Sequence, residues 1–250
     1  DLILAFVCDE EYASIGTAHI AGRVSADAAI VTEPTGLDLC IAHKGFAWLE
    51  IGTHGVAAHG SLPEEGVDAI AAMGPVLCGI SDLQESLERR AAHPLLGTPS
   101  VHASLISGGS ELSTYPGRCT LAVERRTVPG ESDAQGEAEC RALRQAAGRG
   151  GPEFPASLTM GVTRQPFEIA PDHPFVRLVS AAVSDAAGRA PAMTGAFGWM
   201  DSALLAAAGI PTVIFGPDGA GAHADEEWVD LASTELALRA LDETAARFCA

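Results

Sequence analysis

An apolar run that ends in three acidic residues constrains this sequence more than any other feature. Residues Leu2 to Cys8 are continuously apolar, and Asp9-Glu10-Glu11 follow directly. Such a run predicts a strand buried on both faces, and open α/β sheets bind ligands beyond the carboxyl ends of their strands. Because successive side chains of an extended chain point in opposite directions, one glutamate can hold a cation while its neighbour faces a water molecule. A solvated strand end is the simpler reading of the triplet alone.

Two further predicted strands end in residues of the same chemical kind. The run Ala28 to Thr32 is short, apolar and partly β-branched, and it leads to Glu33. The run Pro211 to Phe215 leads into a glycine-rich loop that ends at His223. If the three strands are neighbours, Glu11, Glu33 and His223 converge. One imidazole with several carboxylates is a typical zinc ligand set, and the extra carboxylates suit a two-metal site better than a structural one.

Composition narrows the class of partner. The 250 residues include 15 basic and 33 acidic ones, a net charge of −18, which argues against binding to nucleic acid or to an anionic membrane surface. Six cysteines are scattered without a Cys-x-x-Cys pair, and several fall inside apolar runs as small core residues do. No run is apolar for long enough to span a bilayer, and no signal peptide is visible. We therefore expect a cytoplasmic protein that acts on a small polar or cationic molecule, without nucleic-acid or membrane partners.

The middle of the chain has a different order of predicted strands and helices from its two ends. Residues 43–163 predict the order strand, helix, strand, strand, helix, strand, which is typical of the ferredoxin-like, split β-α-β fold. Residues 1–42 and 164–250 alternate strands and helices as α/β domains do. The predicted fold class is α/β: a discontinuous catalytic domain, similar to that of zinc peptidases, formed by 1–42 and 164–250. The α+β ferredoxin-like domain 43–163 is inserted into it as a lid and dimerisation domain.

Local patterns predict where several helices begin and end. In the insert, a first helix passes through Pro75, and a second is capped by Ser132 and stops at Gly148. In the outer domain, Asp172 and Ser233 are the predicted caps of two helices. A further helix is predicted from Asp201 to Ala208.

Together these features resemble the dinuclear zinc aminoacylase and carboxypeptidase family, peptidase family M20. This family includes acetylornithine deacetylase, succinyl-diaminopimelate desuccinylase and glutamate carboxypeptidase. The resemblance covers essentially the whole chain. Each motif alone is a weak to moderate signal, but their order and spacing are a strong one. The motifs are Cys8-Asp9-Glu10-Glu11, Val31-Thr32-Glu33-Pro34, Lys44-Gly45, Ala57-Ala58-His59-Gly60-Ser61, Pro63 to Ile70, Arg126 to Glu131, and His223 followed by Glu227.

The resemblance implies catalytic and metal-binding roles for five residues. Glu10 would be the general base that takes a proton from the metal-bridging water and later protonates the leaving amine. Glu11 and His223 would hold one zinc ion, and Glu33 the second. The histidine that matches His59 reaches into the partner subunit's active site in dimeric relatives and supports the oxyanion there. The implied cofactor is two zinc ions per complete active site, with cobalt or manganese as replacements.

The resemblance also implies how a substrate is held. Arg126, or with less support Arg125, would bind the substrate α-carboxylate as a fork. Asp201 and Ser202 would form walls of the pocket, and Ser113 stands in the lid where relatives often carry an asparagine. The implied substrate is an N-acyl amino acid or a small peptide, and the implied partner is a second copy bound through the lid. The acyl group and the amino acid recognised stay open.

Two elements of the family pattern do not occur in this sequence. They are a His-x-Asp motif and, some thirty residues later, an aspartate that bridges both metals. Both belong upstream of Asp1, so we expect the sequence to be the later part of a longer enzyme. By itself we expect it to bind at most one metal loosely and to be catalytically silent.

Three functional hypotheses remain. The first is a metal-dependent amidohydrolase that cleaves an N-acyl amino acid or small peptide. The second is a non-catalytic binding or regulatory homologue, or an inactive fragment, that keeps the lid dimer. The third is an unrelated dizinc aminopeptidase, which should lack the inserted domain. The presence of Glu10 beside Glu11, Glu33 and His223 favours the enzyme, because a scaffold need not keep a base beside its ligands.

Overall fold

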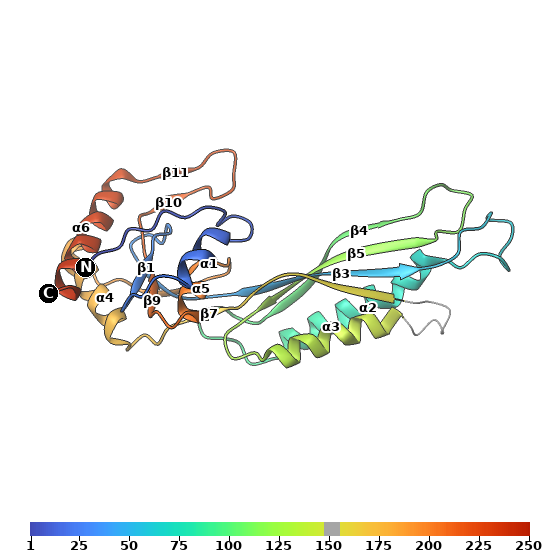
Figure 1. The fold of residues 1–250 in the computed structure, drawn as a ribbon, viewed down its shortest axis with the longest axis horizontal. Coiled ribbons are helices and arrows are strands. Elements are labelled where there is room, and N and C mark those ends of the chain that lie inside the picture. The colour runs from blue at the N-terminus through green and yellow to red at the C-terminus, as the bar shows by residue number, and fades with distance from the viewer. Residues whose placement is uncertain (148–155) are drawn as a thin grey trace. The chain divides into compact units, whose positions relative to one another are not determined.

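A computed structural model describes residues 1–147 and 156–250 (Figure 1). The chain divides into two compact units: unit 1 comprises residues 1–43 and 166–250, and unit 2 comprises residues 44–165. The limits expected from sequence, 42 and 164, lie within two residues of this division. Because unit 2 interrupts unit 1 in the chain, the insertion has the sequence position expected for a lid.

Unit 1 is built on a small mixed sheet. Strands β1 (Ala29–Val31) and β9 (Thr212–Ile214) pair in parallel, and β9 pairs with the fully buried strand β2 (Leu39–His43). Strand β2 also pairs with β7 (Phe167–Glu168) and β8 (Met193–Ala196). A short hairpin of β10 (Gly219–Ala220) and β11 (Trp228–Val229) stands apart from this sheet. The parallel pairing brings the carboxyl ends of β1 and β9 to one edge of the sheet, as the sequence predicts.

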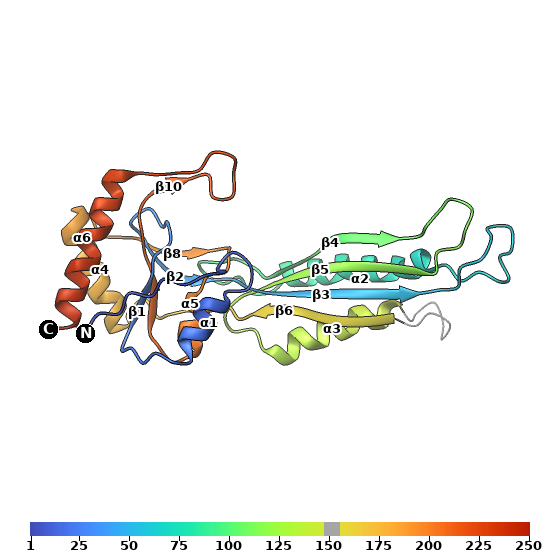
Figure 2. The same cartoon turned by 45° about the horizontal axis from the view of Figure 1, so that its top comes forward.

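Two pairs of helices complete unit 1. Helices α4 (Pro174–Ala187) and α6 (Leu231–Phe248) pack on each other, and so do α1 (Ile15–Ala21) and α5 (Ser202–Ala207). Figure 2 shows the sheet strands between these two pairs. The apolar residues of α4 recur at the spacing of one helix face, and Phe175, Val176 and Val179 on that face are buried.

The predicted first strand does not form. Residues Leu2 to Cys8 have no strand conformation, and Leu4 and Phe6 are 73% and 93% exposed. No described strand pairs with this run. An apolar run becomes a buried strand only where a neighbour satisfies its backbone N–H and C=O groups, and the run by itself cannot supply that neighbour.

Unit 2 has the predicted element order. Strand β3 (Gly45–His54) lies between β5 (Arg118–Thr127) and β6 (Ala156–Arg164), and β4 (Ser100–Gly108) forms the edge beyond β5; all neighbours are antiparallel. Helices α2 (Ala69–Glu88) and α3 (Asp133–Ala147) cover one face of this sheet (Figure 1). The core between helices and sheet contains Leu49, Ile51, Met73, Val76, Leu121, Val123 and Leu143.

The helix ends partly follow the sequence signals. Helix α2 continues through Pro75, and the side chain of Ser132 accepts a hydrogen bond from the backbone N–H of Gln135 at the start of α3; Gly148 lies outside the described residues. Two predicted caps are wrong. The residue that caps α4 is His173, not Asp172, and Asp230 caps α6 three residues before Ser233. In α6 the Asp230 carboxylate accepts the Ser233 N–H at 2.6 Å, so Ser233 is already inside the first turn.

The six cysteines are all free. In the part of the chain that the structure describes, no helix is both long enough and apolar enough to cross a membrane.

Candidate active site

Glu10 and Glu11 lie in a tight turn before α1 rather than at the end of a strand. Asp9 has a left-handed backbone with φ 67°, and its carbonyl oxygen accepts hydrogen bonds from the N–H groups of Tyr12, Ala13 and Ser14. The buried Ser14 hydroxyl donates to the Glu10 carbonyl at 3.3 Å. The turn therefore fixes the two glutamates by local hydrogen bonds, without the predicted strand.

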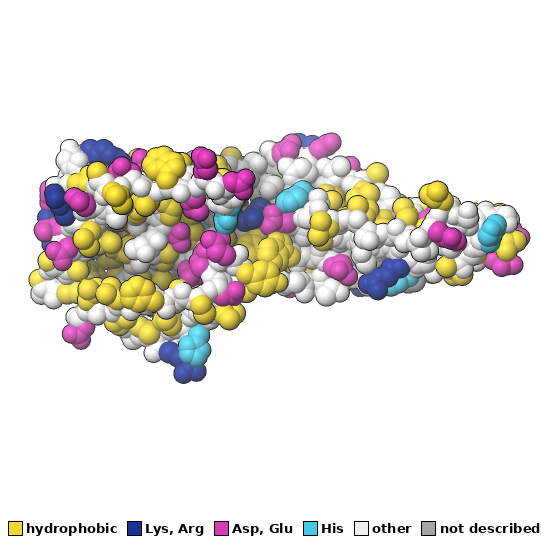
Figure 3. Space-filling model, turned by 90° about the horizontal axis from the view of Figure 1, so that it is seen from above, with side chains coloured by type: hydrophobic (Ala, Val, Ile, Leu, Met, Phe, Trp, Pro, Cys, Tyr) yellow, Lys and Arg dark blue, Asp and Glu magenta, His cyan; other side chains and the backbone are white. Residues whose placement is uncertain are grey.

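Glu33 lies at the edge where β1 and β9 end, and His223 lies further along the chain after β9. Glu33 follows β1, and the loop after β9 passes so close that a Cβ atom on Gly216 would lie 2.3 Å from the Glu33 carbonyl oxygen. This close approach requires glycine at position 216. His223 lies in the loop between β10 and β11, and its Nε2 is 3.6 Å from Glu11 Oε2. The side chains of His223 and Glu11 are both largely exposed. Figure 3 shows acidic side chains grouped on the surface of unit 1, with a histidine among them.

The carboxylates of this region perturb one another. The pKa of Glu10 is raised to about 7, first by burial and then by the charges of Glu33, Asp201 and Glu11, while His223 opposes the shift. The pKa of Glu33 is raised as well, by burial and then by Asp201 and Glu11. The structure thus brings together Glu10, Glu11, Glu33, Asp201 and His223, which we call the acidic site.

The acidic site fits a divalent cation in chemistry. Carboxylate oxygens and an imidazole nitrogen are the donors that such ions take, and the site carries more negative than positive charge. The side chains of the acidic site are, however, too few to surround an ion completely. Among the described residues, no three His, Cys, Asp or Glu side chains are close enough together to hold one ion between them. The structure places Glu11 and His223 as a pair.

Asp201 and Ser202, the expected pocket walls, are both buried at the start of α5. Asp201 Oδ2 accepts a hydrogen bond of 2.5 Å from Thr17 Oγ1, and the Ser202 hydroxyl lies 2.9 Å from Nε2 of the buried His43. The sequence analysis identified neither Thr17 nor His43 as a partner of these residues. Neither pairing has a local signal, because the partners lie 184 and 159 residues apart.

His59 and Ser113 lie on two neighbouring loops of unit 2. The loops are joined by a bridge between His59 and Thr114 and by a hydrogen bond of 2.6 Å from the Gly60 N–H to the Ser113 carbonyl. Both side chains are exposed, and His59 Nδ1 lies 2.8 Å from Ser61 Oγ. His59 Nε2 has no hydrogen-bond partner among the described residues, so that nitrogen is available to a ligand.

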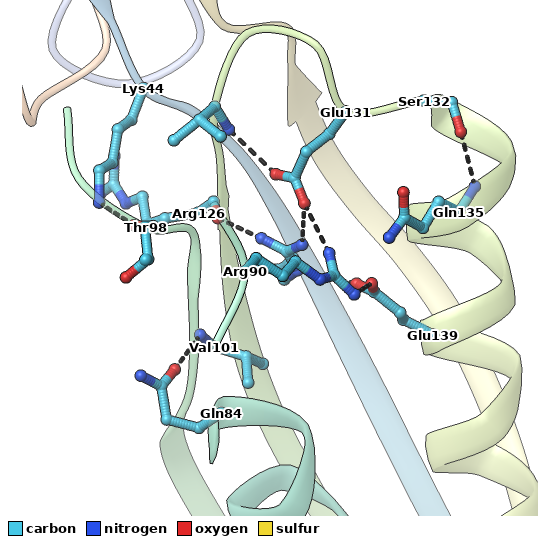
Figure 4. A network of polar contacts seen from close by, with 12 residues as sticks. Lys44, Gln84, Arg90, Thr98, Val101, Arg126, Glu131, Ser132, Gln135 and Glu139 are labelled. Atoms are coloured by element: carbon cyan, nitrogen blue, oxygen red, sulfur yellow. Dashed lines mark hydrogen bonds and ion pairs between the residues drawn. The ribbon is translucent and has the colours of Figure 1, made fainter. Parts of the chain in front are cut away.

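Arg125 and Arg126 are neighbours on β5 but have different surroundings. Arg125 is buried and contacts Glu131 at 2.6 Å and Glu139 at 3.0 Å, and Arg90 bridges the same two glutamates (Figure 4). Arg126 is half-buried. It pairs with Glu124 at 2.9 Å and lies over the ring of Phe46, 5.3 Å from its centroid. Because the two glutamates already engage Arg125, Arg126 is the better candidate of the two to bind a substrate carboxylate.

The chain is similar in sequence to known peptidases and deacetylases. Residues 41–152 match the model of the peptidase dimerisation domain of the M20 family. The chain is 29% identical over 256 residues to the acetylornithine deacetylase of Myxococcus xanthus, and 28% identical over 257 residues to that of Vibrio cholerae. Both alignments cover 99% of this chain and 65% of the relative, so the chain spans about two thirds of the length of the curated relatives it matches.

Solved structures show the same fold. A dinuclear metal-binding peptidase of the M20 family from Bacillus subtilis superposes with a TM-score of 0.70 at 18% identity, covering 97% of this chain and 64% of that one. A tripeptidase from Staphylococcus aureus gives a TM-score of 0.77 at 18% identity, over 95% of this chain and 61% of that one. These findings confirm the resemblance to the M20 family and its fold, an α/β domain interrupted by a dimerisation domain.

Proposed function

We propose that the full-length protein hydrolyses an amide bond in an N-acyl amino acid or a small peptide with the help of divalent metal ions. The observation that carries the proposal is the charge of the acidic site. Glu10, Glu33 and Asp201 are partly or wholly buried near one another, and among the described residues only His223 lowers the pKa of Glu10. A bound cation would supply the missing positive charge. The relatives named acetylornithine deacetylase support this class of reaction.

Glu11 and His223 would hold one ion, and Glu33 the second. When bound, the ions would polarise the scissile carbonyl group and make the attacking water more acidic. The similarity to the Bacillus subtilis protein, a dinuclear metal-binding peptidase, supports divalent metal. Zinc, with cobalt or manganese as replacements, remains the proposal made from the sequence resemblance.

Glu10 would move the proton. Its carboxylate would accept a proton from the attacking water and donate it to the leaving nitrogen, so that the amide yields a carboxylic acid and an amine. Its position in the turn suits this role, because Glu10 is half-buried and directly precedes a metal-binding candidate.

Substrate contacts are proposed in both units. Arg126 would bind the substrate carboxylate as a fork, since its ion pair with Glu124 uses only Nη2. Asp201 and Ser202 in unit 1 and Ser113 in unit 2 remain proposed substrate contacts, and the cytoplasmic location remains a prediction.

We also propose a homodimer formed through unit 2, to which the match with a dimerisation domain points. The edge strand β4 carries Leu105 and Ile106, which are 74% and 55% exposed, and edge strands of this kind associate readily. In such a dimer His59 would support the oxyanion in the partner subunit's site. Mixing inactive His59→Ala and inactive Glu10→Gln subunits should restore activity, because hybrid dimers contain one intact composite site. Hybrid dimers without activity would refute this role.

A second candidate is a non-catalytic homologue that keeps the dimerisation domain. It is favoured by one observation: no three metal-binding side chains of the described residues come together. The two candidates differ in their response to metal, because a binding homologue needs no hydrolytic water.

The deciding experiment is an assay of the full-length protein on N-acetylornithine, other N-acetyl and N-succinyl amino acids, and dipeptides. Treatment with a chelator should abolish hydrolysis, and added zinc, cobalt or manganese should restore it. The Glu11→Ala variant should bind less metal than the wild-type protein. Absence of hydrolysis in a metal-loaded, folded protein would favour the non-catalytic homologue.

A further inference from the structure

Asp201 is a buried carboxylate whose hydrogen-bonding capacity is only half used. The residue is 4% exposed, and it precedes α5 without capping that helix through its side chain. Oδ2 accepts the hydrogen bond from Thr17 Oγ1, whereas Oδ1 has no hydrogen-bond partner among the described residues. A buried carboxylate oxygen without a donor is costly, so Oδ1 requires a donor from a ligand or from bound solvent.

The surroundings of Asp201 are acidic. Among the described residues no lysine, arginine or histidine forms an ion pair with it, and it lies close enough to Glu10 and Glu33 for its charge to act on both. These three carboxylates come from three segments: the turn before α1, the end of β1 and the residue before α5. The oxygen that lacks a donor therefore belongs to a carboxylate in a group of negative charges, and such a group favours a cation.

Thr17 fixes the carboxylate in this region. Thr17 lies in α1, which follows the turn that carries Glu10 and Glu11, and α1 packs beside α5 (Figure 2). Its hydroxyl is buried with Asp201 and donates at 2.5 Å. The hydrogen bond thus holds the Asp201 carboxylate beside the segment of the proposed metal ligands.

We propose that Asp201 is an outer-sphere carboxylate of the divalent-cation site. Thr17 holds its Oδ2, and its Oδ1 accepts a hydrogen bond from a water molecule or another donor in the coordination shell of the ion. Such partners orient the coordinating groups and increase metal affinity without touching the metal. The inference rests on the proposed metal-dependent function, and it makes Asp201 a positioning residue rather than a substrate contact.

A purely structural role is the competing explanation, in which Asp201 does no more than join α5 to α1. Two matched variants separate the explanations. Asp201→Asn removes the negative charge and keeps an oxygen that can accept from Thr17. Thr17→Val removes the hydroxyl at almost constant size and leaves the charge in place. A structural role predicts similar effects of both variants, whereas an outer-sphere role predicts that metal affinity depends on the charge.

The experiment titrates the metal-free, full-length protein with zinc and, separately, with manganese. Calorimetry measures the affinity for each ion. Asp201→Asn should lower the affinity by about 10- to 100-fold, the usual cost of losing an outer-sphere partner. Thr17→Val should lower it far less. Unchanged affinity in Asp201→Asn, or an equal loss in Thr17→Val, would overturn the proposal. If Asp201→Asn does not fold, as judged by circular dichroism, Asp201→Ser takes its place.

A third variant, Glu11→Ala, separates this proposal from the proposed function. If Glu11→Ala loses metal while Asp201→Asn binds it as the wild-type protein does, the metal site stands and the outer-sphere role fails. If the wild-type protein binds neither ion, the metal site and the role of Asp201 fail together.

Discussion

The protein contains two groups of interacting charged side chains, and they differ in balance. In unit 2, Arg90, Arg125, Glu131 and Glu139 form an ion-pair network in which each arginine contacts both glutamates (Figure 4). In unit 1, the acidic site combines four carboxylates with one histidine, and Asp201 Oδ1 has no partner among the described residues.

This difference distinguishes charges that stabilise the fold from charges that, as we propose, bind a ligand. The ion-pair network joins Arg125 on β5, Arg90 just after α2, Glu131 in the turn before α3 and Glu139 within α3. Its charges cancel, so nothing further is needed to stabilise it. The acidic site is destabilising as long as no cation is bound, because burial and mutual repulsion raise the pKa of Glu10 and Glu33. Charge balance, more than the number of charged residues, identifies the candidate active site.

The largest expected effect is on catalysis at the acidic site. In the full-length protein, Glu10→Gln should reduce turnover by at least about 10²–10⁴-fold, because it removes the proton acceptor but no proposed metal ligand. Steady-state kinetics and metal analysis on the same sample measure both consequences. Normal turnover in a metal-loaded Glu10→Gln protein would exclude Glu10 as the general base.

The next effect concerns the ion-pair network. Glu139→Gln should lower the free energy of unfolding by about 3–5 kcal/mol, because Arg125 would keep a buried charge with one carboxylate fewer. Glu137→Gln is the matched control on the same helix: its pair with Arg141 is exposed and should contribute about 0.3–0.5 kcal/mol. Urea unfolding of both variants makes the comparison. Equal effects would show that the network is no more stabilising than a surface pair.

The smallest effect is the pH dependence of the metal-free protein. An acid whose pKa is raised on folding binds more protons in the folded state, so its contribution to stability is present below about pH 4.5 and is lost as the pH rises to about 7. Glu10 should therefore make the metal-free protein less stable over this range, and Glu33, whose pKa is also raised, should act in the same direction. Urea unfolding at several pH values, with a chelator present, measures the trend. Glu10→Gln should flatten it, and a trend unchanged by this substitution would show that Glu10 is not its source.

The sequence by itself determined the elements whose signals are local. The alternation of β3 and β5, the apolar stripe of α2 and the cap at Ser132 depend on neighbouring residues, and all of them appear in the structure. The strands β1 and β9 also form where their apolar runs predict them, and their ends bring Glu33 and the loop at Gly216 together. The family motifs allowed the residues of the acidic site to be named in advance.

Only the tertiary structure decided what depends on a distant partner. The run Leu2 to Cys8 has the composition of a strand but finds no described strand to pair with. Because successive side chains of a strand point to opposite faces of the sheet, Arg125 and Arg126 on β5 must have different surroundings. Only the positions of Glu131 and Glu139 show that Arg125 is the one buried in ion pairs.

The bond between Thr17 and Asp201 is the clearest case, since 184 positions separate the two residues. Periodicity and capping rules describe interactions within a few residues, and side-chain hydrogen bonds across a fold leave no such pattern. The sequence therefore named the acidic residues, and the fold decided which of their charges are balanced.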